Sequence, residues 1–175
     1  MKHALLVPLL LCCSLLCSAQ FREQLNAKAS ITFPVAAQKG KSDQNNYWVA
    51  DTGQDSLAMH LMAMTLNSLD YDLSAKAIAE NYDKPEFIDA LISGMVGEKA
   101  HIKELSRNKI LSGKAKGYAI DMINEEPSEE YPYTHMYIRF LFAGTHIYML
   151  GAYTDADAAN EKIRNQFFNS LTIKP

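Results

Sequence analysis

The fold is decided by residues 131–153, which read YPYTHMYIRFLFAGTHIYMLGAY. Two runs rich in aromatic and branched apolar residues, 131–143 and 146–153, flank the dipeptide Gly144-Thr145. Such runs are typical of strands, and glycine at the first position of a two-residue loop fits a type II′ turn. This stretch therefore predicts a long antiparallel β-hairpin.

Alternation divides the hairpin into two faces, because successive side chains of a strand point in opposite directions. One face is apolar and comprises Met136, Ile138, Phe140, Phe142, Ile147, Met149 and Gly151. The other face is rich in tyrosine and histidine and comprises Tyr133, His135, Tyr137, Arg139, Leu141, His146, Tyr148 and Leu150. We expect the apolar face to lie under a helix.

The second face supports two interpretations. In the functional one it is a recognition surface, because tyrosine and arginine dominate binding hot spots and a guanidinium can hold a carboxylate or phosphate through two hydrogen bonds. The candidate binding residues are Tyr133, His135, Tyr137, Arg139, His146 and Tyr148. In the structural one a second helix covers this face and Arg139 pairs with an acid of the loop 125–130, since a buried unpaired arginine is strongly destabilising.

The rest of the chain supplies further strands and two main helices. Strand-like runs lie at 31–34, 47–50, 56–66, 102–111 and 114–123. Ser74 can cap a short helix, and Pro85 suits the first turn of a longer one. A helix after Asp155 ends the chain. The sequence predicts an α+β fold in which helices pack on an antiparallel sheet of about six or seven strands.

The first 19 residues have the pattern of an export signal. Lys2 and His3 precede an apolar run from Ala4 to Leu16, which is too short to cross a bilayer. Small residues before Gln20 predict cleavage there, so we expect 1–19 to be a signal peptide, 20–29 an N-terminal lead-in and 30–175 a single domain. A lipoprotein signal that lipidates Cys17 is the alternative.

Cysteine content limits the chemistry of the exported chain. The three cysteines, Cys12, Cys13 and Cys17, all lie in the predicted signal. Cleavage before Gln20 would leave no disulfide, no cysteine-ligated zinc and no thiol nucleophile. We expect the protein to reside in the periplasm or outside the cell.

Charge and motifs exclude several functional classes. A formal net charge of −3 disfavours nucleic-acid binding. The sequence contains none of the glycine-rich, nucleophile-elbow or metalloprotease motifs. Residues 113–117, Gly-Lys-Ala-Lys-Gly, are better explained as a turn than as a phosphate loop. His135 and His146 share a face but lack the third ligand of a catalytic zinc, so we expect neither a metal nor a cofactor.

The order of these elements resembles the group that contains the photosystem PsbP proteins and the Mog-type Ran-binding fold. The residues that carry the resemblance are Ile31-Thr32-Phe33-Pro34, the hairpin segment 139–148 and Phe167-Phe168-Asn169-Ser170-Leu171. The resemblance implies an αβα sandwich and a non-catalytic binding or assembly role. It transfers no functional residue to this chain.

Together these observations predict an exported, non-enzymatic module that recognises a protein or small ligand through the Tyr/His/Arg face of its sheet. Two alternatives remain open at this point. One is a metal-dependent hydrolase that uses His135 and His146, and the other is a purely structural subunit of an oligomer.

Overall fold

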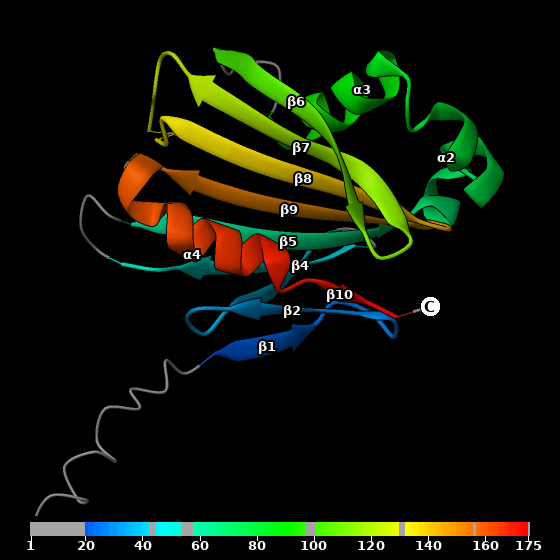
Figure 1. The fold of residues 1–175 in the computed structure, drawn as a ribbon, viewed down its shortest axis with the longest axis horizontal. Coiled ribbons are helices and arrows are strands. Elements are labelled where there is room, and N and C mark those ends of the chain that lie inside the picture. The colour runs from blue at the N-terminus through cyan, green and yellow to red at the C-terminus, as the bar shows by residue number, and fades with distance from the viewer. Residues whose placement is uncertain are drawn as a thin grey trace, which may run out of the picture.

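The structure, a computed structural model, describes residues 20–42, 45–53, 58–96, 101–129, 132–155 and 157–174. The predicted signal peptide, 1–19, lies outside the described residues. The centre of the molecule is an antiparallel sheet of seven strands in the order β3-β4-β5-β9-β8-β7-β6 (Figure 1). Its strands are β3 (Gln38–Ser42), β4 (Asn45–Asp51), β5 (Met59–Asn67), β6 (Ile102–Ser112), β7 (Ala115–Asn124), β8 (His135–Ala143) and β9 (His146–Thr154).

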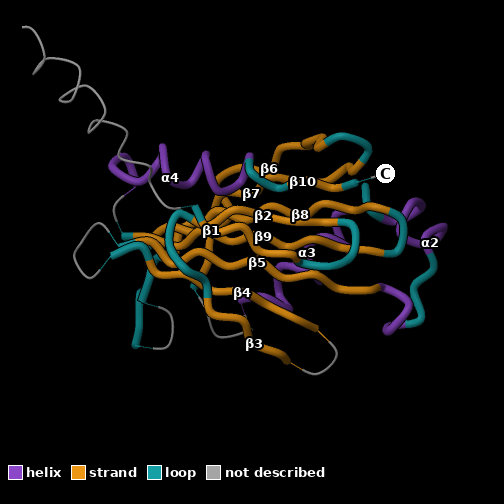
Figure 2. The backbone as a smooth tube through the Cα atoms, turned by 90° about the horizontal axis from the view of Figure 1, so that it is seen from below, coloured by secondary structure: helices purple, strands orange, loops and turns teal. Residues whose placement is uncertain are grey.

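A three-stranded sheet and the helices cover the two faces of this large sheet. The small sheet consists of β1 (Phe21–Gln24), β2 (Ala29–Phe33) and β10 (Thr172–Ile173). The helices are the 3₁₀ turn η2 (Ser68–Tyr71), α2 (Ala75–Asn81), α3 (Pro85–Val96) and α4 (Asp157–Asn169). The small sheet and α4 lie on one face, and α2 and α3 lie on the other (Figures 1 and 2). The predicted α+β class and helix–sheet–helix layering are confirmed.

The face under α4 holds the larger core, which we call the α4 core. Phe167 and Phe168 of α4 pack here against Ile31 and Phe33 of β2. The large sheet contributes buried residues from five of its strands, among them Trp48, Leu61, Ala115, Leu141 and Tyr148. Alternation along each strand therefore directs one set of side chains to α4 and the other set to the opposite layer.

The opposite face holds a second core, which we call the α3 core. Ile78 of α2 and Ile88 of α3 are its fully buried helical residues. They cover the predicted apolar face of the hairpin, represented by Met136, Ile138, Phe140, Phe142, Ile147 and Met149. The prediction that this face lies under a helix is confirmed.

The turn of the central hairpin forms at the predicted dipeptide. Ala143 pairs with His146, which leaves Gly144 and Thr145 as a two-residue loop. Gly144 has a φ of +63°, a value that favours glycine, whereas the φ of Thr145 is not positive. This combination is that of a type II′ turn, whose twist matches that of the flanking strands.

The helix starts also follow the sequence. The Ser74 hydroxyl accepts a hydrogen bond from the Ala77 backbone N–H at 3.1 Å and so caps α2. Pro85 is the first residue of α3, where its missing N–H leaves no intrahelical bond unmade. Within the described part of the chain, every helix is too short or too polar to cross a membrane.

The segment expected to be a loose lead-in contains a strand instead. Phe21–Gln24 pairs antiparallel with β2, in a register that places Phe21 opposite Phe33. The Arg22 side chain donates to the Ser30 hydroxyl at 2.8 Å. The prediction was wrong because the strand is stabilised by this pairing and not by an apolar alternation of its own, which is the signal that sequence reading uses.

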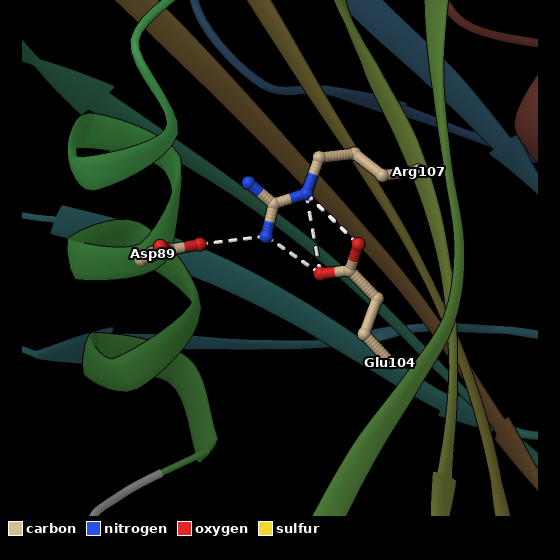
Figure 3. A network of polar contacts seen from close by, with 3 residues as sticks. All are labelled: Asp89, Glu104 and Arg107. Atoms are coloured by element: carbon tan, nitrogen blue, oxygen red, sulfur yellow. Dashed lines mark hydrogen bonds and ion pairs between the residues drawn. The ribbon is translucent and has the colours of Figure 1, made fainter.

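A β-bulge in β6 places the side chains that connect the sheet with α3. The register shifts between Glu104 and Ser106, so Leu105 is an extra residue in the ladder. Glu104 and Arg107, three positions apart, consequently lie on the same face. The Arg107 guanidinium donates to Glu104 and, at 2.6 Å, to Asp89 of α3 (Figure 3). These two carboxylates raise the pKa of Arg107, and the ion pairs position α3 on the sheet.

Candidate functional site

The structure separates the six predicted binding residues into four places. Tyr137 and Arg139 lie in the middle of the sheet, under α4. The Arg139 guanidinium is 4.4 Å from the ring centre of Phe168, and it donates to Asn169 Oδ1 at 3.2 Å. The Arg164 guanidinium lies 3.6 Å from the ring centre of Tyr137. A helix thus covers this part of the face, as the structural interpretation proposed.

The partner of Arg139 differs from the expected one. The described hydrogen bond goes to Asn169 of α4, not to an acid of the loop after β7. Burial, followed by the neighbouring Arg164, lowers the pKa of Arg139. The acidic loop could not supply the partner because Arg139 pairs with Ala119, several residues before that loop begins. Arg139 therefore contacts α4 through Asn169 and Phe168.

Tyr133 lies on the opposite face from the one predicted. Its ring centre is 5.6 Å from that of His60 and 6.0 Å from that of Tyr153. His60 is hydrogen-bonded to Asp51 at 2.7 Å. The face predicted for Tyr133 from strand alternation was wrong because β8 begins only at His135. Tyr133 therefore precedes the region where side chains alternate. Burial raises the pKa of Tyr133.

The two histidines of the hydrolase hypothesis lie far apart. His135 begins β8 opposite Thr154, whereas His146 begins β9 opposite Ala143 at the other end of the hairpin. Eight residue steps of about 3.4 Å place them roughly 27 Å apart, so one metal ion cannot bind both. Among the described residues no cluster of three or more His, Cys, Asp or Glu side chains is placed to hold a metal.

His146 and Tyr148, the remaining pair, line a cleft of about 500 Å³ at the end of the sheet. The cleft lies where β10 ends beside the β6–β7 and β8–β9 turns (Figure 1). Its rim carries Lys28, Lys114 and Lys174. We call this site the basic cleft, and its remaining wall consists of Gly113, Ala115, Phe142, Ala143, Gly144, Thr145 and Ile173.

The three lysines reach the basic cleft from separate parts of the chain. Lys114 follows Gly113, whose φ of +60° forms the tight turn between β6 and β7. Lys28 lies in the β1–β2 turn, where Asn26 Oδ1 accepts hydrogen bonds from the backbone N–H groups of Lys28 and Ala29. The backbone N–H of Lys174 donates to the Lys28 carbonyl at 2.8 Å, which holds these two residues side by side.

The floor of the basic cleft is aromatic and firmly held. Tyr148 is 1% exposed, and its hydroxyl accepts a hydrogen bond from Asn26 Nδ2 at 3.2 Å. The pKa of Tyr148 is raised by burial. The half-buried His146 ring stacks on Tyr148, with the ring centres 6.2 Å apart. The floor therefore offers a fixed surface with imidazole nitrogens at its edge.

The electrostatic character of the basic cleft contrasts with that of the whole chain. The chain has a net charge of −3, yet three exposed ammonium groups meet here. Lys28, Lys114 and Lys174 form no ion pair with any other residue that the structure describes. This arrangement can attract an anion, orient it by hydrogen bonds and pack its apolar part on the floor.

Sequence reading found the floor of this site but not its rim. The alternation of the hairpin indicated His146 and Tyr148. Lys114 belongs to the glycine-flanked segment 113–117, whose pattern predicts a turn and not an anion site. Lys28 and Lys174 lie at opposite ends of the chain, so no local pattern could have joined them.

Comparisons with known proteins agree on the fold. The Ran-binding protein Mog1p of Saccharomyces cerevisiae superposes with a TM-score of 0.55 at 8% identity, over 89% of this chain and 96% of that one. A protein of unknown function from Pseudomonas aeruginosa, PA94, gives a TM-score of 0.50 at 12% identity, over 89% of this chain and 98% of that one. No family model and no curated protein sequence matches. The chain thus has the Mog-type fold that its sequence resembles.

Proposed function

We propose that this protein is an exported, non-enzymatic binding module whose basic cleft receives an acidic segment of a partner protein. The observation that carries the proposal is the convergence of Lys28, Lys114 and Lys174 around the His146–Tyr148 floor. Of the predicted binding face, His146 is the residue that would contact the partner, and the buried Tyr148 ring supports it from below. Tyr137 and Arg139 hold α4 in place instead.

The chemistry of the cleft favours a carboxylate-bearing segment. Hydrogen bonds between an ammonium and a carboxylate are stronger than neutral ones, and three lysines can share two or more carboxylates. Lysine side chains are flexible, which suits an extended acidic segment better than a single rigid anion. The half-buried His146 ring, which stacks on Tyr148, offers a surface for the aliphatic part of glutamate side chains.

The fold comparison supports a binding role rather than a chemical one. Mog1p, which shares the fold, is a Ran-binding protein. The predicted histidine pair of a hydrolase is separated along β8 and β9. The described part of the basic cleft offers cations and a tyrosine with a raised pKa, and this set suits recognition better than bond cleavage.

A titration with hexaglutamate tests the proposal. Amide signals of the ¹⁵N-labelled mature protein are followed by NMR as the peptide is added. We expect saturable shifts confined to the walls of the basic cleft, residues 28, 113–115, 142–146, 148 and 173–174. Replacing Lys28, Lys114 and Lys174 together with glutamine should weaken the affinity at least about ten-fold, because several charge-assisted hydrogen bonds are lost.

The matched control removes three exposed lysines outside the cleft, Lys41, Lys76 and Lys162. This variant has the same net charge as the cleft variant but keeps the site. It should bind hexaglutamate within about two-fold of the unmodified protein, since distant surface charges are screened by salt. Equal weakening in both variants would reduce the effect to overall charge and contradict the proposal.

Export is the second part of the proposal, and it rests on the N-terminal sequence. A small-residue cleavage site after an apolar run of this length is typical of a secretory signal. We expect N-terminal sequencing of the protein from the producing cells to begin at Gln20. A chain that begins at a lipidated Cys17 would support the lipoprotein alternative, and a chain that keeps Met1 would contradict export.

A further inference from the structure

A second hollow, of about 260 Å³, adjoins the basic cleft. Lys114, Phe142 and Gly144 line both, so the β6–β7 and β8–β9 turns form a shared ridge between them. Helix α2 lies at this same end of the sheet and supplies one wall of the hollow (Figure 1). We call this hollow the α2 pocket, and its other lining residues are Ala75, Ile78, Ala79, Tyr82 and Lys116.

The α2 pocket is lined by aromatic rings and methyl groups. The ring centres of Tyr82 and Phe142 lie 6.1 Å apart, with the ring planes tilted by 52°. Tyr82 is half-buried, whereas Ala75 and Ala79 are exposed and lie one helical turn apart on α2. Aromatic rings pack well against other rings in tilted or offset arrangements. This lining therefore favours an aromatic side chain as the occupant.

The rim of the α2 pocket is cationic. Lys116 lies opposite Phe142 in the β7–β8 ladder, and its Nζ is 5.8 Å from the ring centre of Tyr82. The nearby carboxylate of Asp83 already accepts hydrogen bonds from Lys109 and Tyr118.

No acidic side chain is among the described residues that line the α2 pocket. An aromatic ring seated there could therefore also present its face to the ammonium group of Lys116, a contact that an aliphatic side chain cannot make.

Size and position indicate where this ring comes from. The pocket is smaller than the roughly 300–1,000 Å³ of sites that hold drug-sized molecules, so it suits one side chain better than a separate ligand. Lys114 stands on the shared ridge, where it can hold a carboxylate of a segment that continues from the basic cleft. A segment bound in the basic cleft would thus place a neighbouring side chain over the α2 pocket.

From these features we infer that the α2 pocket receives an aromatic side chain of the same acidic partner segment that the basic cleft binds. The recognised motif is then a group of carboxylates next to a phenylalanine, tyrosine or tryptophan. This inference rests on the proposed function, and it adds the feature that would distinguish the partner from other acidic chains. Buried aromatic residues often dominate the affinity of such interfaces.

The test compares three peptides in which hexaglutamate carries Gly-Gly and one further residue at each end. That residue is phenylalanine, leucine or serine, and its presence at both ends makes the direction of binding unimportant. By calorimetry the phenylalanine peptide should bind at least about ten-fold more tightly than the serine peptide, because a ring is buried. The leucine peptide should bind about three-fold more weakly than the phenylalanine peptide, since it lacks the contact with Lys116.

NMR of the ¹⁵N-labelled mature protein locates the ring. The phenylalanine peptide should shift the amide signals of Ala75, Ala79, Tyr82 and Lys116, and the serine peptide should leave these four signals almost unchanged. Both peptides should shift the signals of the basic cleft.

A variant of α2 tests the pocket itself. Ala79→Phe fills it with a ring of the protein's own and should remove the advantage of the phenylalanine peptide over the serine peptide. Glu80→Phe adds a ring at an exposed position of α2 that does not line the pocket, and it should retain this advantage. The ratio of the two affinities is compared within each protein, so the change in net charge cancels. Circular dichroism checks that both variants keep the fold.

The outcomes separate this inference from the proposed function. Equal binding of the phenylalanine and serine peptides at the basic cleft would overturn the inference and leave the proposed function standing. Absence of binding by all three peptides would overturn both. Equal binding of the leucine and phenylalanine peptides would contradict the aromatic preference, and an advantage that persists in Ala79→Phe would contradict the assignment to the α2 pocket.

Discussion

The two faces of the large sheet are closed by different means. Under α4 the contact is apolar, because Phe167 is 1% exposed and its ring centre lies 5.0 Å from that of Phe33. On the other face α3 has one fully buried side chain, Ile88, among its described residues, and ion pairs from Arg107 position the helix. Apolar burial contributes most of the stability of a fold, whereas exposed ion pairs contribute little. We therefore expect the α4 face to contribute more of the stability than the α3 face.

The largest difference should come from removing one aromatic ring from each face. Phe167→Ala is expected to lower the free energy of unfolding by about 3–5 kcal/mol, because it leaves a cavity in a fully buried site. Phe87→Ala, on the half-buried side of α3, should lower it by about 1–2 kcal/mol, since the ring is partly solvated already. Urea unfolding followed by fluorescence measures both. Equal losses would contradict the proposed difference between the faces.

The second effect concerns the residues that hold α4. Tyr137→Ala combined with Arg139→Ala removes the contacts with Arg164 and Phe168. The free energy of unfolding should therefore fall by about 2 kcal/mol. The melting temperature should fall, while hexaglutamate should still shift the amides of the basic cleft. Unchanged stability with lost hexaglutamate binding would instead restore the interpretation of these two residues as a recognition surface.

A smaller effect is expected when the ion pairs beneath α3 are removed. Arg107→Met keeps the apolar stem but loses the bonds to Asp89 and Glu104, which should lower stability by about 1 kcal/mol. Amide hydrogen exchange should become faster in α3 and stay unchanged in α4. Lys76→Met, which removes the exposed pair with Glu80 on α2, is the control and should not alter exchange in α3.

The smallest predicted effect is a pH dependence of stability. It arises at Asp83, between α2 and α3, where a second set of polar contacts joins these helices to the sheet. Lys109 Nζ and the Tyr118 hydroxyl donate hydrogen bonds to Asp83 and lower the pKa of its carboxyl. A carboxyl whose folded pKa is lowered adds stability above its unfolded pKa of about 3.9, and that stability is lost as pH falls through the folded pKa.

Asp83→Asn should therefore lower the melting temperature at pH 6 and change it much less near pH 2.5. Thermal unfolding followed by circular dichroism at the two pH values measures this difference. The same decrease at both pH values would show that the charge of Asp83 is unimportant. The pKa of Tyr118 is raised to about 12, by burial first and then by Asp83, so its hydroxyl remains a donor throughout this range.

Much of the fold could be predicted because its signals are local. The alternation that separates Phe140 from Tyr137, the glycine first in the hairpin turn and the cap at Ser74 each depend on a few neighbouring residues. The strand at Phe21–Gln24 was missed because its evidence lies in its pairing with β2. The bulge at Leu105 was missed because only the register with β7 reveals an extra residue.

The candidate site was predicted only in part, for the same reason. His146 and Tyr148 belong to one hairpin, so strand alternation could assign them to one face. Lys28 and Lys174 join them only when β10 pairs with β2, and the sequence contains no sign of that short strand. Arg139 was given a binding role because its cover, the last turn of α4, is also distant in sequence.

The most direct test of the central claim is the salt dependence of hexaglutamate binding, measured by calorimetry at low and high NaCl. Attraction to Lys28, Lys114 and Lys174 should make the affinity of the unmodified protein fall steeply as salt rises. Most of this dependence should disappear in the protein in which Lys28, Lys114 and Lys174 are glutamine. The same steep dependence in both proteins would mean that the basic cleft does not attract the peptide, and the proposed function would be wrong.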